Sequence, residues 1–349
     1  MVMKKYKIIL LIIGYTTPYI IFAQNISGEY TTELQYNLKK NFNCVNLLRL
    51  YLSIPTKNGL LFSFASIHTF KINKHISNDY QTFSNVEEEN CLGAISLLGC
   101  TKINKLYNLF IGIRNVNEDF FTSESTSLFT NSSCGIFPTI SASYPIANYP
   151  LSGLTLFFEG NFGKLHFKNS VYNGKGYNGY THNNNPFIIA PKQDGIFNIT
   201  EINYNYRNSS YFGGIALHTC TPNTNIILNG TTQKYKKLSA AWWLYTEQYI
   251  CKYKNGDLKL MAQYSENTNK NAGCNRYSEI GLTYNKKDFM TGISLQHANF
   301  IQGNEFSSEI TYRQKVNNSI TIQSSLHYIK NNYSTYFIPT IRMSYNIKH

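Results

Sequence analysis

The chain has 349 residues, a formal net charge of +13 at pH 7 and a mean hydropathy of −0.29. This mean hydropathy excludes a bundle of apolar membrane helices, and no run of ~18 apolar residues follows the N-terminal segment. Tyr (28) and Phe (22) are abundant, Trp (2) is scarce and only 15% of residues are charged, a composition that favours strands and turns over helices.

The N-terminus has the pattern of a secretory signal. A basic segment at residues 4–7 is followed by an apolar run over 8–21. The small residue Ala23 lies just after this run, at the expected cleavage site. This order predicts a cleaved signal peptide over residues 1–23 and a single domain over residues 24–349. The apolar run is too short to favour an uncleaved membrane anchor.

The next informative stretch lies in the first half of the mature chain. An apolar, strand-like run ends at Arg114, an acidic and aromatic turn follows at 118–121, and another strand begins after Pro150. The residues between are broken by glycine and proline, at positions such as Gly135 and Pro138. A long irregular segment of this kind inside a compact domain is usually functional.

Later segments alternate strictly between apolar and polar residues, which is the signature of strands with two different faces. The alternation is clearest in residues 201–206, 258–264, 279–284, 309–313, 320–328 and 337–345. Short polar turns at 254–257 and 315–318 are typical of hairpins. Longer connections are expected at 73–91, 122–136, 170–195, 221–236 and 265–276.

The alternation of short turns and longer loops, expected from residue 239 onward, indicates an all-β chain folded as a transmembrane antiparallel β-barrel. About 325 mature residues leave ~20 per strand and connection for about 16 strands, and a spanning strand needs ~10 of them. Strand ends rich in Tyr and Phe fit aromatic girdles at the two membrane interfaces. A soluble β-sandwich or β-solenoid would also explain the alternation, but not so many aromatic residues on the outside.

The sequence offers no catalytic or metal-binding constellation. The seven cysteines form no CxxC pair, and no HxH, HExxH or GxSxG pattern occurs, so we expect neither an enzyme nor a cofactor. Cys91 and Cys100 could pair in an oxidising compartment, but the sequence leaves this open. The acidic run 87–89 fits a solvated loop better than a cation site.

Nucleic acid is not an expected partner. Removing the three lysines of residues 4–7 lowers the net charge from +13 to +10. The remaining basic residues are scattered, with 234–237 as the densest cluster, and form no stripe or binding motif.

Three motifs, at 112–120, 129–138 and 149–154, resemble the core signature of the carbohydrate-selective porin family (OprB type). Weaker similarity in the same order is found at 79–85, 195–204, 241–248 and 309–314, so that the resemblance covers roughly residues 60–345. The chain departs from the family in being short, and its last aromatic residue, Tyr345, is followed by four others.

This resemblance implies an outer-membrane barrel of 16 strands, with long loops at one rim and one loop region folded toward the lumen. Small sugars would diffuse passively through the resulting polar constriction, without covalent chemistry. Outer-membrane lipid and the barrel-assembly machinery are the other implied partners, and association into a homo-oligomer is left open. A non-selective general porin, a structural outer-membrane barrel and a secreted soluble β enzyme or adhesin are the alternatives.

The motifs also suggest which residues line the pore. A constriction for sugars needs hydrogen-bond donors and acceptors, which the guanidinium group and carboxylates supply. The leading candidates are Arg114, Glu118 and Glu201, and the further candidates are Asp119, Trp243, Glu247 and Arg313. A salt-bridge ladder that only stiffens the barrel is the alternative role for these charges. Alternation directs one of the two adjacent tryptophans, Trp242 and Trp243, into the lumen without deciding which.

Overall fold

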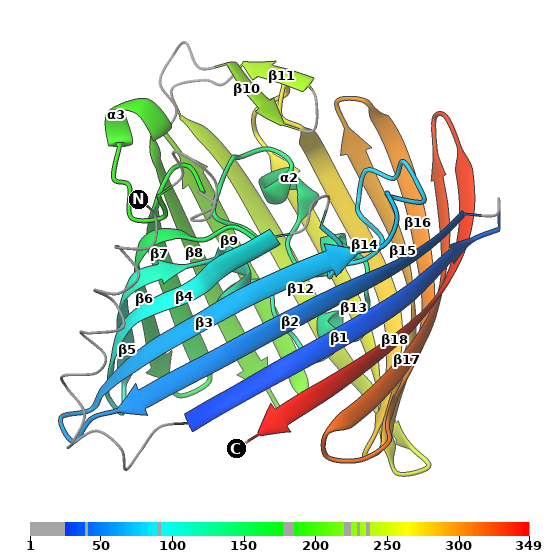
Figure 1. Cartoon of the computed structure of the whole chain (residues 1–349), viewed down its shortest axis with the longest axis horizontal. Coiled ribbons are helices and arrows are strands. Elements are labelled where there is room, and N and C mark those ends of the chain that lie inside the picture. The colour runs from blue at the N-terminus through cyan, green and yellow to red at the C-terminus, as the bar shows by residue number, and fades with distance from the viewer. Residues whose placement is uncertain are drawn as a thin grey trace, which may run out of the picture.

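A closed antiparallel barrel of 16 strands forms the body of the molecule (Figure 1). The structure, a computed structural model, describes residues 25–38, 41–88, 92–176, 185–219, 225–228, 231–234 and 238–348. The predicted signal peptide over residues 1–23 and Cys91, one half of the cysteine pair considered above, lie outside these residues. The barrel confirms the predicted fold class and strand number.

The first and last strands pair with each other and close the barrel. The first half consists of β1 (Asn25–Asn37), β2 (Asn41–Pro55), β3 (Leu60–Lys71), β4 (Leu92–Ile103), β5 (Tyr107–Arg114), β6 (Gly153–Phe162), β7 (Leu165–Asn173) and β8 (Ile196–Tyr206). The second half consists of β9 (Ser209–His218), β12 (Ser239–Tyr253), β13 (Gly256–Asn267), β14 (Cys274–Lys286), β15 (Phe289–Phe300), β16 (Gly303–Lys315), β17 (Ile320–Asn331) and β18 (Thr335–Lys348). A separate hairpin pairs β10 (Asn225–Leu228) with β11 (Thr231–Lys234).

The two rims of the barrel differ in the length of their connections. The short-turn rim, at the bottom in Figure 1, joins consecutive strands by tight turns such as Lys254-Asn255, where both residues have positive φ. The opposite, long-loop rim carries the extended connections, among them the segment that contains the short helix α3 (Pro191–Asp194). The expected alternation of short and long connections after residue 239 does not continue, because residues 301–302 alone join β15 to β16.

The outer face of the barrel is apolar. Along each strand, alternate apolar side chains stand exposed on the outside, for example Ile202, Leu244, Ile280 and Ile310. Their neighbours in sequence point inward and are buried. An apolar outer face is the reverse of the surface of a soluble protein, and it is stable only in contact with the hydrocarbon of a membrane. Among the described residues, none of the helices is long and apolar enough to cross a bilayer.

Exposed and half-buried aromatic residues of the outer face form a band near each rim, as the sequence predicts. At the short-turn rim the rings of Tyr253, Tyr284, Phe289 and Tyr312 contact one another in a row across neighbouring strands. At the long-loop rim Phe306, Tyr328 and Phe337 make a second row. Amphipathic or aromatic rings at these two levels are typical of the interfaces between membrane and water.

The largest cluster of buried apolar residues lies inside the barrel, where residues 115–152 fold inward and pack on the wall. We call these residues the main inward segment. It contains the 3-10 helices η1 (Val116–Glu118), η2 (Thr126–Leu128) and η3 (Ser132–Cys134) and the helix α2 (Pro138–Ser141), which stands within the barrel in Figure 1. The predicted inward folding of this loop region is confirmed.

A second connection, residues 72–88, also folds into the lumen, and the sequence did not predict this. We call it the small inward segment. Ile76 and Phe83 pack on Ile329 of β17 and on Tyr336 and Ile338 of β18. The lumen is therefore narrowed by two segments rather than one.

Candidate functional site

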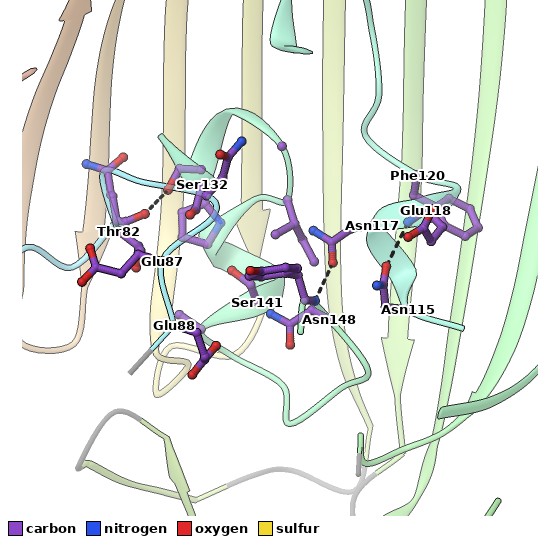
Figure 2. Close-up of a pocket in the computed structure, with 18 of the residues that line it drawn as sticks. Thr82, Glu87, Glu88, Asn115, Asn117, Glu118, Phe120, Ser132, Ser141 and Asn148 are labelled. Atoms are coloured by element: carbon purple, nitrogen blue, oxygen red, sulfur yellow. Dashed lines mark hydrogen bonds between the residues drawn. The ribbon is translucent and has the colours of Figure 1, made fainter. Parts of the chain in front are cut away.

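A polar cavity of about 910 Å³ lies between the two inward segments and the wall (Figure 2). Figure 2 shows Thr82, Glu87 and Glu88 of the small inward segment on one side and Asn115, Asn117 and Glu118 of the main inward segment on the other. The uncharged polar residues that line it are Gln81, Thr82, Asn85, Asn115, Asn117, Thr122, Ser132, Ser133, Ser141 and Asn148. The aromatic lining residues are Tyr80, Phe120 and Tyr149, and the charged ones are Arg49, His75, Glu87, Glu88 and Glu118.

Backbone hydrogen bonds hold the two inward segments together beside this cavity. The N–H of Asn85 donates to the carbonyl oxygen of Thr130 at 2.7 Å, and the N–H of Ser132 donates to that of Thr82 at 2.9 Å. Because each segment supplies partners for the polar backbone of the other, neither leaves those groups unsatisfied in the lumen. The two segments therefore form one continuous structure across the barrel.

Glu118 is the predicted site residue that lines the cavity. It ends η1, and the side chain of Asn115 caps this helix by accepting the N–H of Glu118 at 3.1 Å. Asn117 accepts the N–H of Tyr149 at 3.0 Å, which ties the two ends of the main inward segment to each other. These local bonds fix the turn that the sequence predicted and leave the Glu118 side chain exposed.

Arg114 and Asp119, two further candidates, form an ion pair of 2.6 Å across η1. The guanidinium group lies 4.7 Å from the centroid of the Phe110 ring and 5.1 Å from that of Phe157, both within the range of cation–π contacts. Burial raises the pKa of Asp119 to about 7, although Arg114 opposes this rise. Neither residue is part of the cavity lining.

Replacing Arg114 by alanine is expected to destabilise the barrel by roughly 3 kcal/mol, because it leaves a buried carboxylate without its cation. The pKa of Asp119 then rises further above its ordinary value of 3.8. A carboxyl whose folded pKa is raised destabilises the fold fully above that pKa, and the penalty shrinks as the pH falls from the folded pKa toward the unfolded one. The temperature of thermal unfolding of the R114A variant should therefore rise relative to that of wild type as the pH is lowered from 8.

The control for this measurement is the double variant R114A/D119N. Because asparagine carries no charge to neutralise, its stability relative to wild type should not recover in the same way at lower pH. Equal pH profiles for R114A and the double variant would contradict the assignment of the effect to Asp119.

Four wall carboxylates, Glu201, Glu247, Glu305 and Glu309, accept backbone N–H groups of the inward segments. Glu201 accepts from Phe121 at 3.3 Å and Glu247 from Ser125 at 3.0 Å. Glu309 accepts from Thr130 at 2.9 Å and from Asn131 at 3.1 Å. Glu305 holds the small inward segment, accepting from Tyr80 at 2.8 Å and from Gln81 at 2.9 Å.

Two of these carboxylates, both sequence candidates, also pair with lysines of neighbouring strands. Lys168 lies 3.7 Å from Glu201, and Lys259 lies 2.8 Å from Glu247. Both carboxylates are almost completely buried, under the main inward segment. The structure thus places Glu201 and Glu247 at contacts that hold this segment and outside the cavity lining.

Trp243 points inward and Trp242 points outward. The indole of Trp243 is buried against Phe121 and Phe137 of the main inward segment, with ring centroids 5.0 and 6.1 Å away. The ring of Trp242 contacts that of Tyr264 on the neighbouring strand β13, with 5.5 Å between the ring centroids. The main inward segment covers Trp243, and the indole ring packs between this segment and the barrel wall.

Arg313, the last candidate, is also bound to the main inward segment. Its guanidinium donates to the carbonyl oxygen of Ser127 at 2.8 Å. Of the seven candidates, Glu118 therefore lines the cavity, Arg114 and Asp119 pair beside it, and Glu201, Trp243, Glu247 and Arg313 contact the segment from the wall.

Sequence reasoning missed most of the lining, which comes from asparagine, serine and threonine side chains of the irregular segments. It also read the acidic run 87–89 as a solvated loop. Glu87 is instead buried, with Lys71 at 3.6 Å and His75 at 2.8 Å, and its hydrogen bond raises the pKa of His75. Within the described ranges no group of three or more His, Cys, Asp or Glu side chains could hold a metal ion.

The sequence matches no family model and no curated protein sequence. Solved structures do match. OprB from Pseudomonas putida at high pH is 14% identical with a TM-score of 0.74, over 93% of this chain and 94% of that chain. An anion-selective porin from Comamonas acidovorans is 10% identical with a TM-score of 0.59, over 93% and 99%. A loop-deletion mutant of OmpT, an outer membrane protein of Vibrio cholerae, is 8% identical with a TM-score of 0.58, over 93% and 99%.

At these identities the likeness establishes the fold. The chain has the barrel fold of outer-membrane porins, and the resemblance to the OprB type that the sequence motifs suggested is confirmed at this level. The agreement covers nearly the whole length of each pair of chains.

Proposed function

We propose that this chain is an outer-membrane porin through which small saccharides diffuse passively. The observation that carries the proposal is the lumenal cavity with its amide, hydroxyl and aromatic lining. A sugar presents hydroxyl groups, which need donors and acceptors, and a ring face that is largely apolar. Asparagine and glutamine amides offer both kinds of hydrogen-bonding group, and the half-buried ring of Tyr149 supplies flat apolar surface.

The fold supports the same proposal. A barrel with an apolar outer face belongs in a membrane, and a lumen crossed by two anchored segments favours small solutes over large ones. Passive diffusion requires contacts that are weak and numerous rather than one tight site. Uncharged polar groups around an open cavity meet this requirement.

The predicted residues take different roles in this proposal. Glu118 contacts the passing solute, while Glu201, Glu247 and Trp243 keep the main inward segment in place. Arg114 and Asp119 fix the turn from which Glu118 projects. Outer-membrane lipid surrounds the barrel, the barrel-assembly machinery inserts it after export, and association into a homo-oligomer would leave each lumen separate.

Replacing Glu118 by glutamine is expected to weaken the block of single-channel current by sugars by about fivefold, because a hydrogen bond to a charged acceptor contributes ~1 kcal/mol more than its neutral equivalent. The measurement is sugar titration of the folded protein in planar bilayers. Glu124→Gln is the matched control, since Glu124 lies in the same segment and pairs with Lys259 but is not part of the cavity lining. Its sugar block should stay close to that of wild type.

Two results would decide against the proposal. Absence of conductance in bilayers would exclude a porin. Conductance that sugars leave unchanged would favour the alternative of a general porin or a structural barrel, and liposome swelling rates that follow solute size alone would support that alternative.

A further inference from the structure

We propose that the short-turn rim carries a binding surface for the headgroups of anionic phospholipids. The surface consists of six basic residues in five neighbouring hairpins, and we call it the basic collar. Its members are Lys105, Lys164, Arg207, Lys254, Lys286 and Lys287. The inference rests on the proposed membrane location of the barrel, but it concerns a site outside the lumen.

The collar is continuous because the five hairpins are neighbours in the barrel. They are the β4–β5, β6–β7, β8–β9, β12–β13 and β14–β15 turns, and the strands they join follow one another in the sheet. Five of the six basic residues lie in the turns themselves and are exposed, and Lys286 precedes the last turn on β14. The charges therefore follow one arc of the rim.

Aromatic residues near the short-turn rim contact several of these charges and hold them at the same height on the barrel. Lys164 and Arg207 each lie 5.2 Å from the centroid of the Tyr206 ring. Lys254 lies 5.3 Å from the ring of Tyr253, and Lys286 lies 5.8 Å from that of Phe289. Because these rings stand on the outer face, at the level where membrane meets water, the cations lie at the depth of lipid phosphates.

The collar is poorly neutralised by the protein itself. Asp288 is the one acidic residue in the five turns, so that six positive charges meet one negative charge and leave +5. The nearby Asp257 lies on β13 opposite Lys252, one position from the outward-facing Tyr253, and so faces the lumen. Uncompensated positive charge next to a membrane interface attracts anionic headgroups, at ~1 kcal/mol for each basic residue near the surface.

Phospholipid is favoured over a soluble acidic partner because the charges and the apolar surface form one unit. Above the collar the outer face continues without a break into exposed apolar side chains such as Leu165, Ile202 and Leu282. A lipid molecule offers a phosphate for the cations and acyl chains for this surface. An acidic protein or polysaccharide would use the charges alone.

The test is titration of the folded full-length barrel, in a zwitterionic detergent, with short-chain phosphatidylglycerol. The collar variant carries Lys105→Gln, Lys164→Gln, Lys254→Gln and Lys287→Gln. The control variant loses the same charge at the opposite side of the molecule through Lys74→Gln, Lys192→Gln, Lys270→Gln and Lys330→Gln, all at exposed residues. Binding is read by native mass spectrometry and by the lipid concentration at half saturation.

The collar variant is expected to bind phosphatidylglycerol on the order of 1,000-fold more weakly than wild type, because it loses four charges. The control variant should bind like wild type, and high salt should weaken binding by wild type. Equal losses in both variants, or equal binding of phosphatidylcholine by wild type, would overturn the proposal. Equally tight binding of a soluble acidic polymer would also overturn it and would point to a soluble partner.

Two arrangements keep the test decisive. If the collar variant does not fold, the comparison of phosphatidylglycerol with phosphatidylcholine and the salt dependence in wild type decide the question. Sugar block of the channel is measured on the same preparations. Loss of sugar block with intact lipid preference would count against the porin proposal alone, and sugar block without lipid preference would count against the collar alone.

Discussion

Single-channel conductance is expected to rise and to fluctuate more when Glu309 is replaced by alanine. This carboxylate is fully buried and accepts hydrogen bonds from the N–H of Thr130, at 2.9 Å, and from that of Asn131, at 3.1 Å. The hydroxyl of Thr130 donates to it as well, at 3.1 Å. Removing the acceptor leaves the two N–H groups buried without partners, at a cost of ~1–3 kcal/mol for each group, while the hydroxyl keeps its contact with His327 at 3.1 Å.

The barrel wall does not depend on this carboxylate, because β16 keeps its ladders with β15 and β17. The cost therefore falls on the main inward segment, which is expected to leave the wall around Thr130 and widen the lumen. Recordings in planar bilayers measure the conductance, and thermal unfolding measures the loss of stability.

Glu309→Gln is the matched control for this change. Glutamine has nearly the same shape and keeps one acceptor oxygen for the segment, so its conductance should lie between those of wild type and Glu309→Ala. A Glu309→Ala channel with the conductance and noise of wild type would show that the segment does not need this anchor.

The second large effect is expected from Trp243. Replacing it by alanine should destabilise the fold by ~3–5 kcal/mol, since a large buried side chain is lost and a cavity remains. Its contacts are with Phe121 and Phe137 of the main inward segment. Thermal unfolding of the detergent-solubilised barrel, followed by its heat-dependent shift in electrophoretic mobility, measures the change.

Trp242 provides a control at the adjacent position. It has the same size and lies on the same strand, but it is half-buried on the outer face and contacts Tyr264. Trp242→Ala should have a much smaller effect on unfolding and leave the conductance unchanged. If the two variants lost equal stability, packing under the inward segment would not be the reason for the effect of Trp243→Ala.

Carboxylates on the inner wall of the barrel help to hold folded segments in a polar lumen, where no large apolar core surrounds these segments on every side. Buried N–H groups of an irregular segment need acceptors, because an unpaired buried donor is costly. Glu201, Glu247, Glu305 and Glu309 supply these acceptors from the strands. The same residue type therefore serves as an anchor on the wall and, at Glu118, as an exposed group in the cavity.

Local pattern determined much of this architecture. Period-2 alternation in segments such as 258–264 and 320–328 depends only on neighbours along the chain, and it correctly identified the strands and their faces. The turn at Lys254-Asn255 and the break in regular structure after Arg114 are local features of the same kind. They were sufficient to predict the barrel and its approximate strand number, whereas the inward folding of the main segment was implied by the resemblance of the motifs to OprB-type porins.

Tertiary structure alone decided the roles of individual residues. A carboxylate on an inward-facing strand position can line a pore or bind a segment, and the outcome at Glu201 and Glu247 depends on which distant backbone groups come to lie above them. The orientation of Trp243, the inward course of residues 72–88 and the burial of Glu87 depend on contacts between parts of the chain far apart in sequence. Alternation fixes the face on which a side chain stands, whereas only the folded lumen fixes what that side chain meets.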